Sequence, residues 1–274
     1  MKKYIKEGVR DFNLDHIFDC GQCFRWKKQE NGSYSGIAFG EQVNMDFVYD
    51  EGSDNSGTLI ITGADEEDFE NIWRSYLDLD RDYGKIKEEL ARRDAVIAEA
   101  IEYGKGIRIL KQDLWETIVS FIISQNNNIP RIKGCIENLA GNFGENGNLP
   151  TPEKLQFVTE EELAKVKLGY RAPYLIKTAE QVMQCGLPQN KDQLLELKGV
   201  GPKVASCISL FAMGNMDSFP IDVWVKRVMN QMYGFEEKDV RGMQKFATEK
   251  FAPYGGIAQQ YLFYYIRQIN LEMK

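Results

Sequence analysis

Residues 197–205, which read LKGVGPKVA, constrain the fold more than any other stretch of the chain. An apolar run ends there at two glycines, and a second helical run begins at Pro202, where a proline costs a helix no hydrogen bond. The pattern predicts two helices joined by a tight hairpin. Glycines let the backbone approach a ligand closely, and the free N–H groups at the start of the second helix suit a phosphate. The segment therefore predicts a grip on a DNA backbone.

Two polar residues beside the hairpin suggest chemistry. Lys203 lies in the first turn of the second helix, where the helix dipole disfavours an ammonium and favours the neutral amine that can form a Schiff base. Asp222 lies just before the next amphipathic run, residues 223–232, so it can serve as an electrostatic partner. Each residue also has a simpler explanation, Lys203 as a phosphate contact and Asp222 as a helix N-cap. Spacing alone leaves both explanations open.

The hairpin, followed by FPIDV at residues 219–223, resembles the helix-hairpin-helix (HhH-GPD) DNA glycosylase superfamily. Lys203 resembles the lysine of its bifunctional glycosylase/lyase members, and further matches along nearly the whole chain resemble the 8-oxoguanine DNA glycosylase/AP lyases. The resemblance implies that Lys203 attacks C1′ of the sugar and that Asp222 stabilises the positive charge developing there. The resulting Schiff base would permit β-elimination, which cuts the strand 3′ to the lesion.

A small set of residues matches the base pocket of that family. Gly21 precedes an aromatic and basic strand, Cys207 lies one helical turn after Lys203, and Gln259 and Phe263 are four residues apart in the last helix. Core packing would explain Cys207 and Phe263, and a turn would explain Gly21. The resemblance instead implies that the Gly21 carbonyl accepts the N7–H that 8-oxoguanine has and guanine lacks. Cys207 and Phe263 would then form the pocket walls, and Gln259 would bind the Watson–Crick edge of the everted base.

A second set matches the residues that read the opposite strand. The run at residues 125–131 has three asparagines before Pro130, which is enough to end a helix. Asn and Arg side chains also bind exposed base edges, and an aromatic side chain can wedge into a base stack. The resemblance implies that Asn126, Arg131 and Arg171 read the cytosine opposite the lesion and that Tyr170 is the wedge. We therefore expect a preference for cytosine.

We expect contacts with the DNA backbone at Gly199, Gly201, Val204 and Trp224. Trp224 stands where the family commonly has a histidine, so it can donate to a phosphate but cannot titrate. No organic cofactor is expected. The resemblance implies a structural cation held in the hairpin by the backbone carbonyls of Leu195, Leu197 and Val200. The cysteine cluster that binds an iron–sulfur centre in other superfamily members is absent from the C-terminal sequence, which weighs against endonuclease III-like and adenine-glycosylase activities.

The pattern of hydrophobic residues indicates an α+β fold of two domains. Residues 12–63 are expected to form an antiparallel sheet, with short strands at 24–26, 34–38, 42–45 and 59–62 separated by turn signals. Helices are expected over 69–76 and 83–103, and the pattern is helical from residue 106, with Asp113 as the N-cap of a helix over 115–124. We therefore expect an antiparallel-sheet domain at residues 1–104, an all-helical HhH-GPD domain at residues 105–274, and a cleft between them.

Composition limits the alternatives. The 274-residue chain carries a formal net charge of −7, which weighs against a nucleic-acid partner unless the binding face is locally basic. The single histidine, His16, excludes most histidine triads and multi-histidine metal centres. Five cysteines at irregular spacing, no membrane-span pattern and no signal-peptide core predict a cytoplasmic protein, without a membrane partner. We expect a monomer that binds duplex DNA containing 8-oxoguanine. An alkyl-base glycosylase and a non-catalytic helix-hairpin-helix DNA-binding module remain as alternatives.

Overall fold

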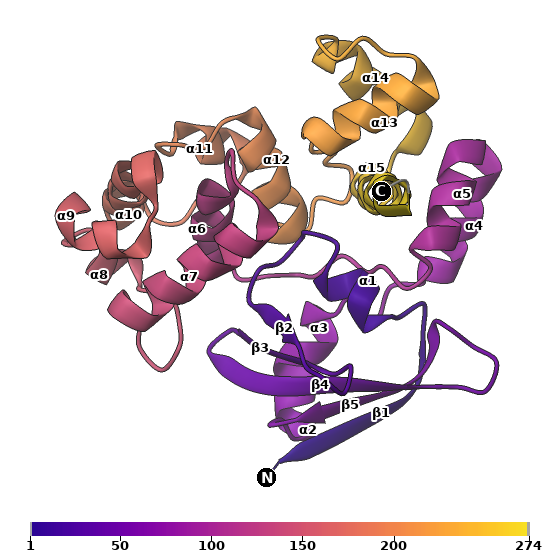
Figure 1. Ribbon diagram of the computed structural model, residues 1–274, viewed down its shortest axis with the longest axis horizontal. Coiled ribbons are helices and arrows are strands. Elements are labelled where there is room, and N and C mark those ends of the chain that lie inside the picture. The colour runs from indigo at the N-terminus through magenta and orange to yellow at the C-terminus, as the bar shows by residue number, and fades with distance from the viewer. Residues whose placement is uncertain (1, 273–274) are drawn as a thin grey trace.

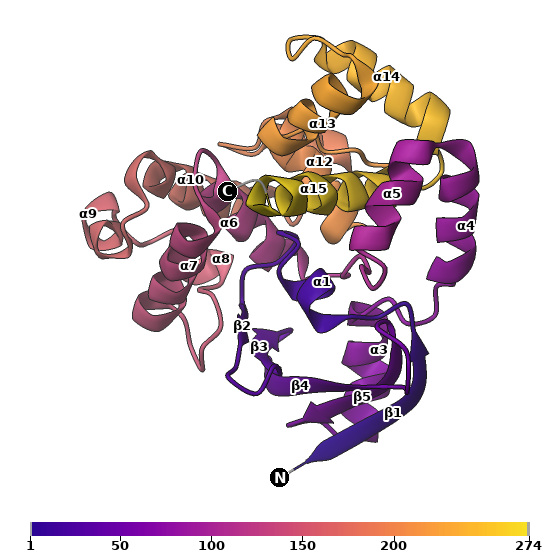
Figure 2. The same cartoon turned by 45° about the vertical axis from the view of Figure 1, so that its right-hand side comes forward.

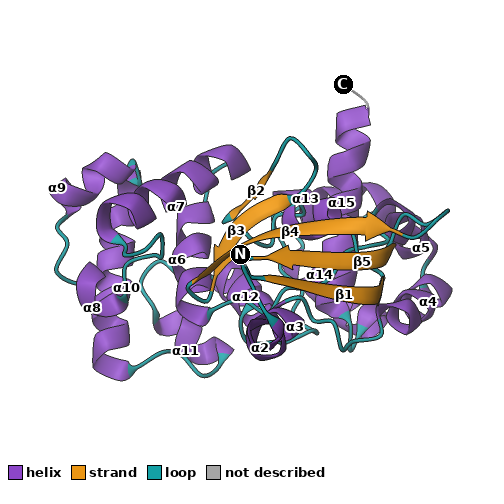
Figure 3. Cartoon of the chain, turned by 90° about the horizontal axis from the view of Figure 1, so that it is seen from below, coloured by secondary structure: helices purple, strands orange, loops and turns teal. Residues whose placement is uncertain are grey.

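The computed structural model describes residues 2–272, in which a sheet lies at one end and most of the helices at the other (Figure 1). The described strands form one antiparallel sheet in the order β1-β5-β4-β3-β2, and Figure 3 shows them side by side. The strands are β1 (Lys3–Arg10), β2 (Trp26–Lys28), β3 (Tyr34–Ala38), β4 (Glu41–Tyr49) and β5 (Ser56–Thr62). The predicted antiparallel sheet and the α+β class are confirmed.

Two strands differ from the sequence prediction. β1 was not predicted, because it lies at the edge of the sheet and buries only Val9, so it lacks the alternation of apolar and polar residues that marks a half-buried strand. β2 begins at Trp26 rather than at Phe24. Phe24 instead packs against Phe121 of the helical part, with ring centroids 5.6 Å apart. The segment before β2 therefore lies between the sheet and the helical part of the molecule.

One face of the sheet is covered by a short helical segment made of α2 (Glu66–Asp68), η1 (Phe69–Trp73) and α3 (Arg74–Tyr76). Asp65 begins it with a capping box that involves Asp68. Its aromatic side chains join a core with the sheet and with α1 (Leu14–Phe18), in which Trp26 stacks on Phe18 at a centroid distance of 4.1 Å. This core joins the sheet, α1 and the covering helical segment into one packed unit.

The predicted helix over residues 83–103 is two helices, α4 (Tyr83–Arg93) and α5 (Ala95–Tyr103). Asp94 separates them in an extended conformation, and its side chain accepts the N–H of Ile97 as the N-cap of α5. The apolar spacing continues across this break, which explains why the sequence suggested one helix. α5 packs along α15 (Gly255–Glu272), as Figure 2 shows, so the apolar faces of α4 and α5 join the core of the helical part. The boundary at residue 104 stays a prediction.

The helical part surrounds α15, which is seen end-on near the centre of Figure 1. Among residues 2–272, no helix has both the length and the apolar character that crossing a membrane requires.

The predicted N-cap at Asp113 is confirmed, since it accepts the N–H of Glu116. The remaining helices are α6 (Leu114–Ser124), α7 (Ile129–Phe143), α8 (Pro152–Leu155), α9 (Glu160–Leu163), η2 (Ala164–Val166), η3 (Gly169–Arg171), α10 (Ala172–Cys185), α11 (Lys191–Glu196), α12 (Pro202–Phe211), α13 (Val223–Tyr233) and α14 (Val240–Phe251).

The predicted hairpin joins α11 to α12, and Pro202 occupies the first turn of α12 as expected. Gly199 lies in the hairpin at a φ of +82°, a conformation that glycine adopts without strain. A Cβ at this position would lie 2.6 Å from the ring of Tyr174, so the close approach of α10 also requires glycine. The sequence of the hairpin therefore fixes the direction in which α12 begins.

Candidate active site

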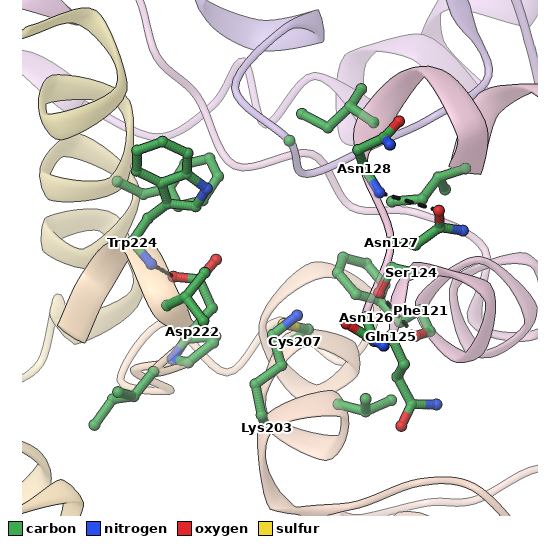
Figure 4. A pocket seen from close by; sticks show the side chains of 18 of the residues that line it. Phe121, Ser124, Gln125, Asn126, Asn127, Asn128, Lys203, Cys207, Asp222 and Trp224 are labelled. Atoms are coloured by element: carbon green, nitrogen blue, oxygen red, sulfur yellow. Dashed lines mark hydrogen bonds between the residues drawn. The ribbon is translucent and has the colours of Figure 1, made fainter. Parts of the chain in front are cut away.

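A cavity of about 890 Å³ lies among the loop before β2, the loop between α6 and α7, and the helices α12, α13 and α15. Figure 4 shows residues of this cavity from α6, α12 and α13 facing one another. Eleven of the predicted site residues line it: Gly21, Asn126, Tyr170, Gly201, Lys203, Val204, Cys207, Asp222, Trp224, Gln259 and Phe263. Gly199, Arg131 and Arg171 are not among the lining residues. Residues from position 21 to position 263 of the sequence thus share one cavity.

Lys203 extends from the first turn of α12 into the cavity, and its side chain lies beside Cys207, one turn further along the helix (Figure 4). The Lys203 ammonium is 5.5 Å from the centroid of the Phe121 ring, within the range of a cation–π contact. Phe121 was not predicted, because an aromatic residue in the buried face of α6 has the same sequence pattern as a core residue. An apolar wall on one side and a thiol on the other therefore position the amine.

The protonation of Lys203 differs from the sequence prediction. Burial lowers the pKa of Lys203, but Cys207 and Asp222 outweigh that effect and hold the pKa above its ordinary value. Burial also raises the pKa of the Cys207 thiol, and the neighbouring Lys203 charge opposes that rise. The direction of the Lys203 pKa is therefore opposite to the lowering that the sequence predicted. Lys203 must lose a proton before it can act as a nucleophile.

Asp222 is the N-cap of α13, which is the structural role that the sequence left open for it. Its Oδ1 accepts the N–H groups of Trp224 at 2.9 Å and Val225 at 2.8 Å. Both capping bonds end on Oδ1, so capping leaves Oδ2 for other partners, and Figure 4 shows the carboxylate facing Lys203 across the cavity. Burial raises the pKa of Asp222, while the Val225 N–H and the Lys203 charge oppose the rise. Capping therefore orients the carboxylate toward the amine.

The predicted base-pocket residues all line the cavity. Gly21 has a φ of +80°, and a Cβ there would lie 3.1 Å from Cε1 of Phe263, so both the backbone conformation and the nearby ring favour glycine at this position. Cys207 and Gln259 are each 4% exposed. The Gln259 Oε1 accepts no hydrogen bond from the described residues. A buried amide oxygen without a partner is costly, which fits a side chain that completes its hydrogen bonds with a ligand.

The loop between α6 and α7 carries Asn126 in the left-handed region, at a φ of +48°. Tyr170 is 49% exposed beside it and donates its hydroxyl to the Gln125 carbonyl at 3.2 Å. Arg171 is 4% exposed, and its guanidinium donates to the carbonyls of Gln125, Leu168 and Asn126. Arg131 is exposed in the first turn of α7. In this structure Arg171 therefore braces the loop, and its contact with a cytosine stays a prediction.

The hairpin presents backbone groups to the same cavity. The first helical bond of α12 is donated by Ala205 to the Gly201 carbonyl at 2.9 Å, so the N–H groups of Lys203 and Val204 have no acceptor within the helix. The Val204 side chain is buried, which leaves only its backbone for a ligand. No described atom lies within 4 Å of a Cβ built on Gly201, so the backbone is open there. These features suit the approach of a phosphate.

The predicted cation site can be tested against the hydrogen bonds of the hairpin. The Leu197 carbonyl accepts the N–H of Val200 at 3.1 Å. Among residues 2–272, nothing donates to the carbonyls of Leu195 and Val200. Carbonyl oxygens without a hydrogen-bond donor are the ligands that a hard cation prefers, so the hairpin fits such an ion.

The charge around the cavity differs from that of the whole chain. Lys203, Lys226 and Arg267 line it, and Asp222 is the only acidic residue among the lining residues that the structure describes. The guanidinium of Arg227 lies 4.6 Å from the ring centroid of Trp224, at the start of α13. The binding face is therefore locally basic although the chain carries a formal net charge of −7. This is the condition under which an acidic protein can bind DNA.

Two family models together cover most of the chain. Residues 4–118 match the model described as 8-oxoguanine DNA glycosylase, N-terminal domain. Residues 119–253 match the HhH-GPD superfamily base excision DNA repair protein. The chain belongs to the 8-oxoguanine DNA glycosylases of the HhH-GPD superfamily. This membership sets aside the two alternatives left by the sequence, an alkyl-base glycosylase and a non-catalytic module.

Known proteins similar to this 8-oxoguanine DNA glycosylase support the assignment. The structure of MBOgg1 in complex with a low-affinity DNA ligand is 44% identical, with a TM-score of 0.91, and covers 98% of this chain and 97% of that one. A second similar structure is the Clostridium acetobutylicum 8-oxoguanine glycosylase/lyase in complex with double-stranded DNA containing cytosine opposite 8-oxoG. It is 40% identical, with a TM-score of 0.89, and covers 98% of this chain and 99% of that one. The Arabidopsis thaliana N-glycosylase/DNA lyase OGG1 is 26% identical over 94% of this chain and 78% of its own.

Sequence reasoning missed two residues of this glycosylase that line the cavity from α15. Gln260 is 2% exposed and follows Gln259 directly. Arg267 places its guanidinium 5.3 Å from the ring centroid of Phe263. The spacing of Gln259, Phe263 and Arg267, four residues each, was a signal that could have indicated Arg267. For Gln260, no signal in the sequence reveals its partner, which lies 240 residues away in the chain.

Proposed function

We propose that this 8-oxoguanine DNA glycosylase excises 8-oxoguanine paired with cytosine from duplex DNA and then cleaves the strand as a lyase. The observation that carries the proposal is the position of Lys203 and Asp222 on opposite sides of one cavity (Figure 4). Gln259 lines the same cavity, and its amide oxygen has no hydrogen-bond partner among the described residues. A nucleophile, an anionic partner and an edge reader are what excision of an everted base requires.

The reaction uses the side chains in a defined order. After losing a proton, the Lys203 amine forms a bond to C1′ as the bond from C1′ to the base nitrogen breaks, and the base leaves with the bonding electrons. Asp222 stabilises the positive charge that develops on the sugar. The adduct opens to a Schiff base, which acidifies the C2′ proton. Loss of that proton and of the 3′ phosphate completes β-elimination, and hydrolysis of the Schiff base returns the lysine.

Base recognition would combine stacking with two hydrogen-bonding surfaces. Phe263 and Cys207 stack on the faces of the everted base, and Gln259 binds its Watson–Crick edge. The Gly21 carbonyl accepts from N7–H of 8-oxoguanine. Guanine presents a lone pair at that atom, so it would face the carbonyl without a hydrogen bond, and a site with such a buried acceptor rejects it strongly. The close contact of Gly21 with Phe263 supports this arrangement.

The opposite strand and the DNA backbone would be held by the remaining predicted residues. Asn126, Arg131 and Arg171 read the cytosine, while Tyr170, half-exposed at the cavity, occupies the space left by the everted base. The phosphates are bound by the hairpin around Gly199 and Gly201, by the Val204 N–H and by the indole N–H of Trp224. A cation held by the carbonyls of Leu195, Leu197 and Val200 would stabilise the hairpin, and the reaction itself needs no cofactor.

The cavity is built from one chain, which supports a monomer as the active form. All five cysteines are free thiols, which supports a reducing compartment such as the cytoplasm. The function is tested by single-turnover excision from otherwise identical duplexes that carry 8-oxoguanine or guanine opposite each of the four bases. The proposal predicts excision of 8-oxoguanine, fastest opposite cytosine, and no excision of guanine. Equal excision opposite all four bases would contradict the cytosine preference, and absence of excision would contradict the proposed function.

A further inference from the structure

The loop that carries Gly21 lies between α1 and β2, outside the strand ladders of the sheet. Gly21 itself has the conformational freedom of glycine, so its carbonyl could change direction at little cost unless its neighbours hold it. On its C-terminal side the loop is held by Gln22, whose carbonyl accepts from Gln112 Nε2 at 2.7 Å and whose Oε1 accepts the N–H of Leu110 at 2.9 Å. The segment 108–112 therefore fixes one end of the loop.

The other end of the loop is held by α15. Gln260 Nε2 donates to the Cys20 carbonyl at 2.6 Å, and both residues are buried. Arg267 Nη1 donates to the Asp19 carbonyl at 3.0 Å. Phe263, between them on the helix, lies against Gly21. Gln260, Phe263 and Arg267 follow the spacing of one helical face, so a single helix fixes two successive carbonyls of the loop and the ring beside them.

The bond from Gln260 matters because it fixes the peptide that directly precedes the Gly21 carbonyl. With the Cys20 carbonyl held by α15 and the Gln22 carbonyl held by Gln112, the Gly21 peptide has little freedom to turn. We propose that Gln260 is a positioning residue for specificity, which orients the Gly21 carbonyl through the Cys20 carbonyl so that the pocket distinguishes 8-oxoguanine from guanine. This inference rests on the proposed function, in which the Gly21 carbonyl accepts from N7–H.

The physical reason is the stiffness of the acceptor. A carbonyl fixed toward N7 gains a hydrogen bond from 8-oxoguanine and meets a lone pair on guanine, so it both attracts one base and repels the other. A carbonyl that can turn away loses part of the bond to 8-oxoguanine and no longer repels guanine. Removing the Gln260 donor should therefore reduce discrimination as well as excision.

The experiment compares Gln260→Leu, which keeps a side chain of similar size but removes the donor, with wild type and with Gln268→Leu. Gln268 lies two turns further along α15 and is not among the residues that line the catalytic cavity. Each full-length protein is assayed on a duplex with 8-oxoguanine opposite cytosine and on the same duplex with a preformed abasic site. Cleavage at an abasic site uses Lys203 but reads no base, so it reports whether the fold and the nucleophile are intact.

The proposal predicts that Gln260→Leu lowers single-turnover excision by about tenfold or more while abasic-site cleavage stays within about twofold of wild type. In a Lys203→Gln background, the same change should lower the ratio of 8-oxoguanine to guanine affinity by about tenfold. Gln268→Leu should change none of these quantities. Equal losses on both substrates, or no loss of discrimination, would overturn the positioning role. Failure of the wild type to excise 8-oxoguanine would overturn the proposed function itself, and this inference with it.

Gln260→Glu adds a readout that a merely structural role would not produce. At this buried position a carboxyl group can donate to the Cys20 carbonyl only when it is protonated, and it repels that carbonyl when ionised. Excision by Gln260→Glu, expressed relative to wild type at each pH, should therefore recover as the pH falls. A ratio that does not change with pH would contradict the inference.

Discussion

Lys203 and Asp222 begin two successive long helices, α12 and α13, and their side chains face each other across one cavity (Figure 4). The hairpin glycines set the start of α12, and the carboxylate of Asp222 itself caps α13. The two groups are therefore positioned by the starts of two helices, one set by the hairpin and the other by its own cap. This arrangement is the basis of the catalytic account.

Asp222 has a structural role and a proposed catalytic role, and two substitutions separate them. Asparagine caps a helix about as well as aspartate, so Asp222→Asn should keep the unfolding free energy within about 0.5 kcal/mol of wild type. It removes the charge, so excision should fall by about 100-fold or more. Asp222→Ala loses the cap as well and should cost about 1 kcal/mol. Thermal unfolding and single-turnover kinetics measure the two effects, and full activity in Asp222→Asn would show that capping is its only role.

The charge on Asp222 should also be visible in the pH dependence of Lys203. Cys207 and Asp222 both raise the pKa of Lys203, and a raised pKa means that the neutral amine appears only at higher pH. Asp222→Asn should therefore lower the pKa of Lys203 and shift the pH midpoint of Schiff-base formation to lower pH. The measurement is the rate of borohydride trapping on a preformed abasic site, normalised to each protein's maximum across the alkaline range. An unchanged midpoint would show that the two side chains are not coupled.

The two hairpin glycines should respond differently to alanine. Gly199→Ala places a side chain at a φ of +82° and 2.6 Å from the Tyr174 ring, so it should destabilise the protein by about 2 kcal/mol. Gly201→Ala meets open space and should leave stability within about 0.5 kcal/mol. The added methyl group would instead obstruct the phosphate. DNA affinity should therefore fall in Gly201→Ala without loss of stability, and wild-type affinity would contradict the proposed phosphate grip.

Arg131 and Arg171 offer a similar contrast at the opposite strand. Arg171→Ala removes the side-chain donor to the Leu168 and Asn126 carbonyls and one side-chain donor to the Gln125 carbonyl, and should cost about 1–3 kcal/mol of stability. Arg131 is exposed, so Arg131→Ala should leave stability nearly unchanged. Excision opposite cytosine, relative to excision opposite adenine, should fall by about tenfold in Arg131→Ala. If that ratio stays at the wild-type value, Arg131 does not read the opposite base.

Features that depend on local chemistry could be predicted from the sequence. Pro202 at the start of α12 and Asp113 as the N-cap of α6 lie where the sequence placed them, because capping and proline geometry involve only neighbouring residues. β1 could not be predicted, because an exposed edge strand carries no apolar alternation. The break at Asp94 was missed for a related reason, since the apolar spacing runs across it.

Features that depend on residues far apart in the sequence were predicted less well. The raised pKa of Lys203 comes partly from Asp222. The sequence shows that the two residues are 19 positions apart, but not that their side chains face each other. The burial of Arg171 depends on the Gln125 carbonyl, 46 residues away. The bond between Gln260 and Cys20 spans 240 residues and has no sequence signature. The site's residue types could therefore be listed from the sequence, whereas their protonation and mutual support required the structure.

The most direct test of the account is borohydride trapping on a duplex with one 8-oxoguanine opposite cytosine, comparing wild type with Lys203→Gln. The account predicts a covalent protein–DNA product with wild type, none with Lys203→Gln, and none with either protein on the same duplex containing guanine. Binding of the lesion duplex by both proteins without trapping by either would contradict it. Lys203 would then be a phosphate contact rather than the nucleophile.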